Sequence, residues 1–344
     1  MTLAGSGVTM ADVNLIFSTM MTLQQSYDTF LKLAIERSPR SKKDIQDDLK
    51  RLKKEYDKMD KEKKEYFDEE SLVNPFLDSR IEVGDPKTKM KRVMVGIDIS
   101  VGEVLLAAEL GRQGKKIDAI LAHHPEGRSL IDLTQVMTTQ IEQAVDDGVP
   151  VNVVEKQIGG RINDLNRALH PTNHYQVPRA AELLDIPMAC YHTFADNQVY
   201  WFMKNYITKA KPKYVSDIIE ALMKLPEYQM AKKKGNGPMM FTGGEKNRCG
   251  KISFSGFTGG TSGSKDTIEN MAQAGVGTIM AMHMPEDHRK LAEKHHMNVV
   301  ICGHMASDSL GMNLLMDELT KKKVEIVEVG GFYRVDRSKK KKLF

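Results

Sequence analysis

Two adjacent histidines, His123 and His124, stand at the end of an apolar run and directly before a proline. The run at 116–122 predicts a short buried strand of a parallel sheet. Neighbouring strand residues point to opposite faces, so both imidazoles can serve one site only where the chain leaves the sheet. Pro125 marks that exit because it cannot donate to a β-ladder. Since ligands usually bind at the carboxyl ends of parallel strands, the pair indicates a metal site.

Two more predicted strands end at side chains of the metal-binding type. Asp196 follows the apolar run 186–191, and His304 follows 298–302. Asp308 stands four residues after His304 as the chain enters a helix, which puts both side chains on one helical face. Imidazoles and carboxylates together suit a pair of divalent ions such as Fe, Zn, Mn, Ni or Co. The alternative for either aspartate alone is an ordinary turn or helix cap.

Other polar residues near these strand ends are candidates for supporting roles. Glu126, directly after the His-His-Pro segment, is the candidate catalytic residue, acting as a general base or as a hydrogen-bond partner of a metal ligand, with a plain surface glutamate as the alternative. His192 can orient Asp196 or face a cavity, and His283 lies before another predicted helix. Asp98, at the end of a predicted strand, is a candidate to line the same cleft, with a helix cap as the simpler account.

A glycine-rich segment at 259–264 leads into a predicted helix. Main-chain amides at such a turn can hold a phosphate or a carboxylate. The alternative is a tight strand-to-helix turn. The segment is not a Walker loop, because no Gly-Lys-Ser/Thr ends it. A P-loop nucleotide hydrolase is therefore excluded.

These residues lie in two blocks of alternating strands and helices, which predicts an α/β fold. The first block begins with a strand at 91–99 and a helix near 101–113. The second begins with a strand at 251–257 and closes with two short strands, at 323–328 and 331–335. The expected organisation is a helical hairpin at 1–73, a first α/β lobe at 74–200, a helical connection at 201–250, a second α/β lobe at 251–335 and a basic tail at 336–344.

The N-terminal segment has a different pattern from the remainder. Apolar residues recur at helical spacing over 13–34, and a second helical stripe runs over 45–59, beginning after Ser41, which resembles a helix cap. The two stripes predict an antiparallel helical hairpin. It is either an arm for oligomerisation or for a partner, or a hairpin packed on its own domain.

Composition limits the class of protein. The chain has 344 residues, 41% hydrophobic and 28% charged, with a net charge of +4 that does not argue for nucleic-acid binding. Much of the positive excess lies in 337–342, which predicts a solvated tail. Three widely spaced cysteines suit a reducing compartment. No apolar run reaches the roughly 18 residues of a membrane span, and no signal peptide is evident, so we expect a cytoplasmic protein.

The ordered motifs resemble those of the NGG-interacting-factor-three-like family, also called the dinuclear metal centre hexameric proteins. The matching text is GIDIS at 96–100, AHHPEG at 122–127, HTFADN at 192–197, GFTGGTSGS at 256–264 and GHMASDSLGMN at 303–313. The resemblance covers most of 74–335 but not the N-terminal hairpin.

The resemblance implies two α/β lobes around a dinuclear metal cleft, in a ring of six subunits. By motif, the metal ligands fall on His123, His124, Asp196 and His304. The family usually has glutamate four residues after the last histidine, whereas this chain has Asp308, whose side chain is about one carbon shorter. Some members are assigned type 2 GTP cyclohydrolase I activity.

The expected function is that of a metal-dependent hydrolase, cyclohydrolase-like, acting on a small anionic or heterocyclic molecule such as a nucleotide. The expected cofactors are two divalent metal ions per chain, and the expected partners are copies of the same chain in a hexamer. The alternative is a metal-binding scaffold or regulatory protein without turnover.

Overall fold

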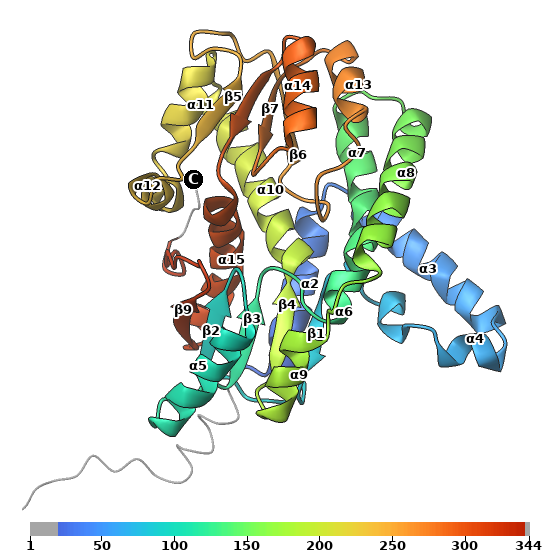
Figure 1. The fold of residues 1–344 in the computed structure, drawn as a ribbon, viewed down its shortest axis with the longest axis vertical. Helices are drawn as coiled ribbons and strands as arrows, with labels where there is room; N and C mark the ends of the chain where they lie inside the picture. The colour runs from blue at the N-terminus through green and yellow to red at the C-terminus, as the bar shows by residue number, and fades with distance from the viewer. Residues whose placement is uncertain (1–19, 341–344) are drawn as a thin grey trace, which may run out of the picture.

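The computed structural model describes residues 20–340, which form two β-sheets joined by long helices (Figure 1). The first sheet has the strand order β1-β4-β3-β2-β9 and the second the order β5-β8-β7-β6. Pairing is parallel except at the edge strands β1 and β5. The α/β fold class is confirmed. The strands are β1 (Ser79–Val83), β2 (Arg92–Gly96), β3 (Ala119–Ala122), β4 (Met188–Tyr191), β5 (Met239–Thr242), β6 (Lys251–Gly256), β7 (Val276–Ala281), β8 (Asn298–Ile301) and β9 (Glu325–Val329).

Helices cover both sheets and link them. In chain order they are α2 (Leu23–Arg37), α3 (Lys42–Lys58), α4 (Lys61–Glu65), η1 (Glu69–Leu72), α5 (Val101–Arg112), α6 (Arg128–Ile131), η2 (Asp132–Thr138), α7 (Thr139–Asp146), α8 (Val151–Leu169), α9 (Gln176–Leu183), α10 (His192–Ala210), α11 (Val215–Leu222), α12 (Pro226–Lys233), α13 (Thr267–Gln273), α14 (Glu286–Lys294) and α15 (His304–Lys321). In residues 20–340, none combines the length and the hydropathy that crossing a bilayer requires.

The central strands are short apolar runs buried along their whole length. Every residue of β3, β4 and β8 is buried. Such runs form because parallel strands covered by helices on both faces have no solvent-facing side. Their carboxyl ends therefore present the first residues that can leave the core.

The last strand belongs to the first sheet, not to the second block in which its sequence lies. Strand β9 pairs in parallel with β2, with Val93 opposite Ile326. The chain returns there through α15, a helix that is buried along most of its length and packs against α10. The segment 331–335, expected to be a strand, has no strand structure.

Helices from the first block complete the core of the second sheet. Ala144 of α7 and Ile158 of α8 share one buried cluster with Ile279 of β7 and Val299 of β8. Figure 1 shows α7 and α8 beside the second sheet, near α13. The two lobes are thus interleaved along the sequence, because helices exchange between them.

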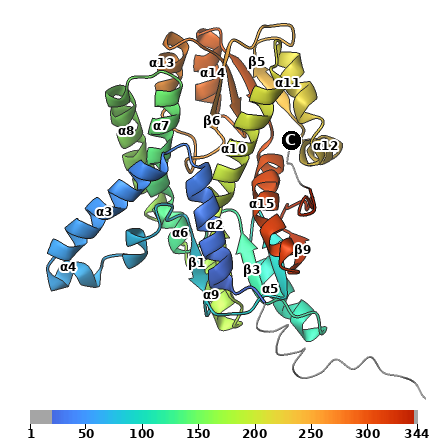
Figure 2. The same ribbon diagram turned by 180° about the vertical axis from the view of Figure 1, so that it is seen from behind.

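The N-terminal segment is only partly the arm that its periodicity predicts. Helix α2 is in the core, where Phe30 contacts Tyr191 edge-on with ring centroids 5.1 Å apart. Helix α3 buries only Ile45 and projects away from the sheets (Figure 2). The beginning of the expected first helix, before residue 20, lies outside the described residues.

The C-terminal segment is not wholly a solvated tail, in contrast to the expectation from its basic composition. Arg337 is 5% exposed and forms a buried ion pair with Glu227 of α12, 2.6 Å away. Its main-chain amide also donates to Asp317 of α15. The pairing partner is distant in sequence, so charge composition alone did not reveal it. Residues 341–344 lie outside the described residues.

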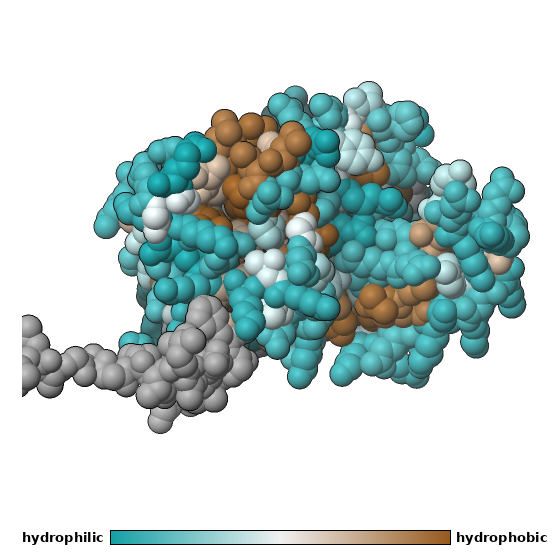
Figure 3. Space-filling model, turned by 90° about the horizontal axis from the view of Figure 1, so that it is seen from below, coloured by the Kyte–Doolittle hydropathy of each residue, from teal (hydrophilic) through white to brown (hydrophobic). Residues whose placement is uncertain are grey.

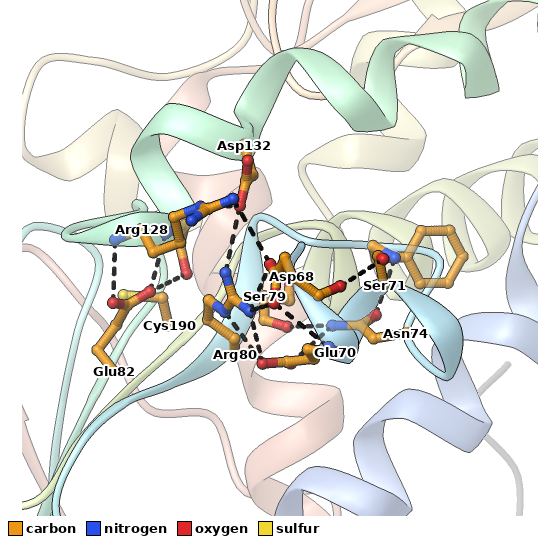
Figure 4. A network of polar contacts seen from close by, with 12 residues as sticks. Asp68, Glu70, Ser71, Asn74, Ser79, Arg80, Glu82, Arg128, Asp132 and Cys190 are labelled. Carbon is orange, nitrogen blue, oxygen red and sulfur yellow. Dashed lines mark hydrogen bonds and ion pairs between the residues drawn. The ribbon is translucent and has the colours of Figure 1, made fainter. Parts of the chain in front are cut away.

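A buried arginine connects the N-terminal segment to the first lobe (Figure 4). Arg80 of β1 forms ion pairs with Asp68, Glu70 and Asp132, at 2.9, 2.8 and 3.2 Å. Asp68 caps η1 and Asp132 begins η2, so one guanidinium holds three elements together. A planar guanidinium suits this role because its donors form a rigid fork.

Replacing Arg80 tests how much this network contributes to stability. The Arg80→Ala change leaves three carboxylates without their shared cation, and we expect the free energy of unfolding in urea to fall by about 3 kcal/mol or more. The control is Arg179→Ala, which breaks an exposed pair with Glu182 and is expected to cost less than about 1 kcal/mol. Equal effects in the two variants would contradict a structural role for the network.

Candidate metal centre

The candidate site lies where β3, β4 and β8 end, between the two sheets. His123 and His124 directly follow β3. Helix α10 begins at His192 directly after β4, and α15 begins at His304 after β8. Each helix thus has a histidine at its first position. An aspartate follows four residues later on the same face, Asp196 in α10 and Asp308 in α15.

Asp308 is at the centre of this cluster and is fully buried. Its Oδ1 lies 3.5 Å from Nε2 of His123. Its Oδ2 lies 3.6 Å from Nε2 of His124 and 3.4 Å from Nε2 of His304. The two carboxylate oxygens therefore face different histidines.

Asp196 and His192 complete the side of the cluster nearest to His123. The Asp196 Oδ1 atom lies 3.6 Å from Nε2 of His123, and its Oδ2 lies 3.9 Å from Nε2 of His192. The rings of His123 and His192 have centroids 5.0 Å apart. The structure therefore brings together all five residues expected as ligands and adds His192 to them.

Several atoms of this cluster are buried without a hydrogen-bond partner. They are both ring nitrogens of His123, Oδ1 of Asp196 and both carboxylate oxygens of Asp308. Leaving such atoms unpaired in a protein interior is unfavourable by about 1–3 kcal/mol for each group, and by more for a charged one. Bound cations would satisfy Nε2 of His123 and the carboxylate oxygens, so the residues present fit a metal ion.

Three overlapping groups of side chains have ligand atoms within 4.8 Å of one another. One is His123, Asp196 and Asp308, the second is His124, His304 and Asp308, and the third is His123, His124 and His192. These buried His and Asp groups can hold a metal ion.

Burial sets the protonation states of these groups. It lowers the pKa of His123 well below its usual value and that of His304 to about 4. Neutral imidazole is the form that binds metals. Burial also raises the pKa values of the Asp196 and Asp308 carboxyls. Without a cation, burial thus favours the neutral forms of these two histidines and two aspartates. A bound cation would favour the ionised form of the carboxylates.

Two further aspartates hold the histidine rings from outside the cluster. Asp78 accepts from Nδ1 of His192 at 2.8 Å and from the Thr193 hydroxyl at 2.7 Å. Burial acts to lower the pKa of His192, but the charges of Asp196 and Asp78 raise it to about 9. Asp98 lies 2.6 Å from Nδ1 of His124. Both contacts leave the Nε2 atom directed to the cluster.

Sequence reasoning predicted neither contact, although one of its two interpretations of Asp98 placed that residue in the same cleft. The expectation that Asp98 caps a helix is wrong, because Ser100 caps α5. The available signal was the position of His124, which follows β3, the parallel neighbour of the strand that Asp98 follows. Asp78 precedes a strand that the sequence pattern did not predict, so it carried no signal.

Glu126, the expected general base, is half-buried beside the cluster rather than within it. Burial raises the pKa of its carboxyl to about 7, and the charges of Glu82 and Asp98 add to the effect. Its main-chain amide donates to Sγ of Cys190 at 3.3 Å. Its catalytic role stays a prediction.

A cavity of about 120 Å³ adjoins the cluster and is bounded by His192, Asp196 and His304. His283 and His288 also line it. The His283 and His304 rings have centroids 4.7 Å apart. The cavity is the space in which a small molecule can approach the cluster.

The glycine-rich segment forms one wall of this cavity as a tight turn. Gly259 and Gly260 have φ angles of +101° and +82°, which favour glycine. Gln140 donates to the carbonyls of Gly259 and Thr261. The helix that follows, α13, has seven residues. The turn interpretation therefore accounts for the glycines without an anion.

The chain was compared with proteins of known structure. The chain is similar to the crystal structure of a NIF3 superfamily protein from Sphaerobacter thermophilus, with a TM-score of 0.64 and 28% identity over 74% of this chain and 92% of that one. Reduced HcgD from Methanocaldococcus jannaschii matches with a TM-score of 0.44 and 16% identity over 73% and 88%. A Bacillus cereus protein related to NIF3 matches with a TM-score of 0.40 and 12% identity over 75% and 92%.

No protein-family model and no curated protein matches the chain. The Sphaerobacter match nevertheless covers 92% of that protein. Its superfamily is the one that the motifs of this chain resemble. By fold and by motif, the chain resembles proteins of the NGG-interacting-factor-three-like (NIF3-like) family.

Proposed function

We propose that this protein is a metal-dependent hydrolase that uses two divalent ions per chain. The observation that carries the proposal is the set of buried, unpartnered ligand atoms on His123, Asp196 and Asp308. A fold retains such a set at a strand end mainly where an ion completes it. We also propose a cytoplasmic location, which the three buried cysteines support because they are free thiols.

The arrangement around Asp308 supports two ions rather than one. One donor set contains His123, Asp196 and Asp308, and the other contains His124, His304 and Asp308. Each set reaches a different oxygen of the same carboxylate. Asp308 would therefore bridge the ions although its side chain is one carbon shorter than the family's usual glutamate.

Elemental analysis tests the metal centre. We expect protein purified without chelators to contain two ions per chain, of Fe, Zn, Mn, Ni or Co. His123→Ala and His304→Ala each remove one donor from a different set, and we expect each to lower the metal content to one ion or less. His170→Ala, at an exposed histidine, is the matched control. Unchanged content in both site variants would overturn the proposed ligand set.

The chain's own residues would contribute positioning and proton transfer. Divalent ions held here would lower the pKa of bound water from 15.7 to near 7. Asp78 and Asp98 fix the rings of His192 and His124. Glu126, with a pKa of about 7, is suited to accept and return a proton near neutral pH. The adjoining cavity would hold the substrate.

Turnover tests the hydrolase proposal. Against nucleotides including GTP, phosphoesters and cyclic amides, we expect metal-dependent hydrolysis by the natural protein and none by Asp196→Ala. Glu126→Gln should retain its metal and lose roughly 100-fold or more in kcat. Full metal occupancy with no hydrolysis of any compound would contradict the enzyme.

That outcome would favour the second candidate, a metal-binding scaffold that contacts other proteins. The feature supporting it is α3, which projects from the sheets with only Ile45 buried. Removal of residues 1–73 cannot test the arm alone, because α2 lies in the core. Charge-reversing changes in α3 are the appropriate test of partner binding.

We also propose that the chain forms a homo-oligomer, with six subunits as the family resemblance implies. Helices α5 and α9 pack side by side and expose Leu105, Leu106, Leu183 and Leu184. Figure 3, which views the molecule from the end where these helices lie, shows an apolar patch there. Contiguous apolar surface of this kind usually contacts another protein.

Light scattering coupled to size-exclusion chromatography tests the assembly. We expect the natural protein to elute as a hexamer and Leu106→Glu with Leu183→Glu to elute as smaller species. A glutamate at Tyr66, which is 81% exposed on another part of the chain, is the control and should leave the assembly intact. A monomeric natural protein would contradict the proposal without affecting the metal centre.

A further inference from the structure

We propose that the cavity beside the metal centre binds an uncharged, largely apolar group of the substrate, about the size of one ring, and excludes phosphate. This inference rests on the proposed function only in placing the reacting end of the substrate at the metal ions. It specifies the substrate class through the cavity walls.

The far wall of the cavity is apolar and rigid. It consists of Ala144, Ile158, Ile268, Met271 and Ile279, all of which belong to the buried cluster of the second sheet. They come from α7, α8, α13 and β7, so four packed elements fix its shape. A group inserted here exchanges water for hydrocarbon contacts, which is favourable only for an apolar group.

Away from its metal end, the cavity has no fixed positive charge. Among the described residues that line it there is no lysine or arginine, and the acidic Asp196 lies at the metal end beside His192. Arg161 contacts the neighbouring loop but donates its Nε to the Ser262 carbonyl and is not part of the lining. A phosphate placed away from the metal end would lose its hydration without gaining a cation.

The glycine-rich segment forms a second wall of the cavity and offers neutral hydrogen-bonding groups. Side chains of other elements hold this segment in position. The carbonyls of Gly259, Thr261 and Gly263 are already engaged by Gln140 and His288. The lining also includes Thr261 and Ser262, and the Ser262 hydroxyl lies 3.5 Å from Nδ1 of His283. Neutral groups of this kind suit the edge of a polar heterocycle as well as an aromatic ring.

The size of the cavity and the flexible methionine side chains that line it favour the binding of a single ring. The cavity volume of about 120 Å³ is somewhat below that of an engineered apolar cavity of about 150 Å³ that binds benzene. Met271, Met282 and Met284 line it, and thioethers adapt their shape and contact aromatic faces favourably. A single flat ring therefore fits with small side-chain adjustments, and any phosphate of the substrate would lie outside.

Three hydroxamic acids that share the metal-binding group and differ in the attached group distinguish binding to the metal from binding in the cavity. Acetohydroxamate, benzohydroxamate and phosphonoacetohydroxamate would be titrated into Co(II)-loaded protein, with the visible Co(II) spectrum as the readout. We expect benzohydroxamate to bind roughly 10- to 30-fold more tightly than acetohydroxamate, because its phenyl group is buried. Phosphonoacetohydroxamate should gain nothing over acetohydroxamate.

Two variants test whether the phenyl group of benzohydroxamate binds in this cavity. Ala144→Leu fills the far wall and Met271→Gln makes it polar at nearly constant volume, and each should abolish most of the benzohydroxamate preference. Ala221→Leu enlarges a buried helical alanine that does not line the cavity and should preserve it. Acetohydroxamate affinity within each variant reports whether the metal centre is intact.

The possible failures are distinguishable. Equal affinity for acetohydroxamate and benzohydroxamate, or a preference that survives in both Ala144→Leu and Met271→Gln, would overturn the apolar cavity while leaving the metal centre in place. A gain for phosphonoacetohydroxamate that equals the gain for benzohydroxamate would overturn the exclusion of phosphate. If no hydroxamate altered the Co(II) spectrum, the proposed metal chemistry would fail and this inference would fail with it.

Discussion

The burial of unpaired imidazole and carboxylate atoms between two sheets is the constraint on which the rest of the structure depends. Asp308 is fully buried and neither of its oxygens has a hydrogen-bond partner. Such a group is tolerated only in a framework that cannot relax around it, since movement of either sheet would expose or separate the donors. The extensive apolar clusters on both sides of the site provide this rigidity.

The framework positions the site through two helices that cross between the lobes. Helix α10 leaves the first sheet and α15 leaves the second, and the two pack against each other. Each contributes a histidine at its first position and an aspartate one turn later. One aspartate lies on a helix that follows a strand of the first sheet, and the other lies on a helix that follows a strand of the second. The distance between them therefore depends on how these two helices pack and not on any loop. The same exchange of elements explains why α7 and α8 form part of the second lobe's core and of the cavity.

Under the proposed function, the reaction and the recognition of the substrate would take place in two adjacent environments of different polarity. The cluster contains the groups of His and Asp side chains that can hold a metal ion in the described part of the chain, and Asp78 and Asp98 orient two of its rings from outside. The adjoining cavity is apolar at its far wall. A substrate spanning both would present a polar, reacting end to the ions and a neutral ring to the hydrocarbon wall. This division follows from the walls themselves and is independent of which reaction is catalysed.

The sequence by itself determined which residues end the buried strands, and hence His123, His124, Asp196, His304 and Asp308, because strand ends and helical spacing are local properties. It also determined the α/β class. Only the tertiary structure decided that Asp78 holds His192, a contact between residues 114 apart in sequence. It also decided that β9 joins the first sheet, that α2 enters the core and that Arg337 pairs with Glu227. These contacts have no local pattern, since they arise when distant segments compete to bury the same apolar surface and to neutralise the same charges.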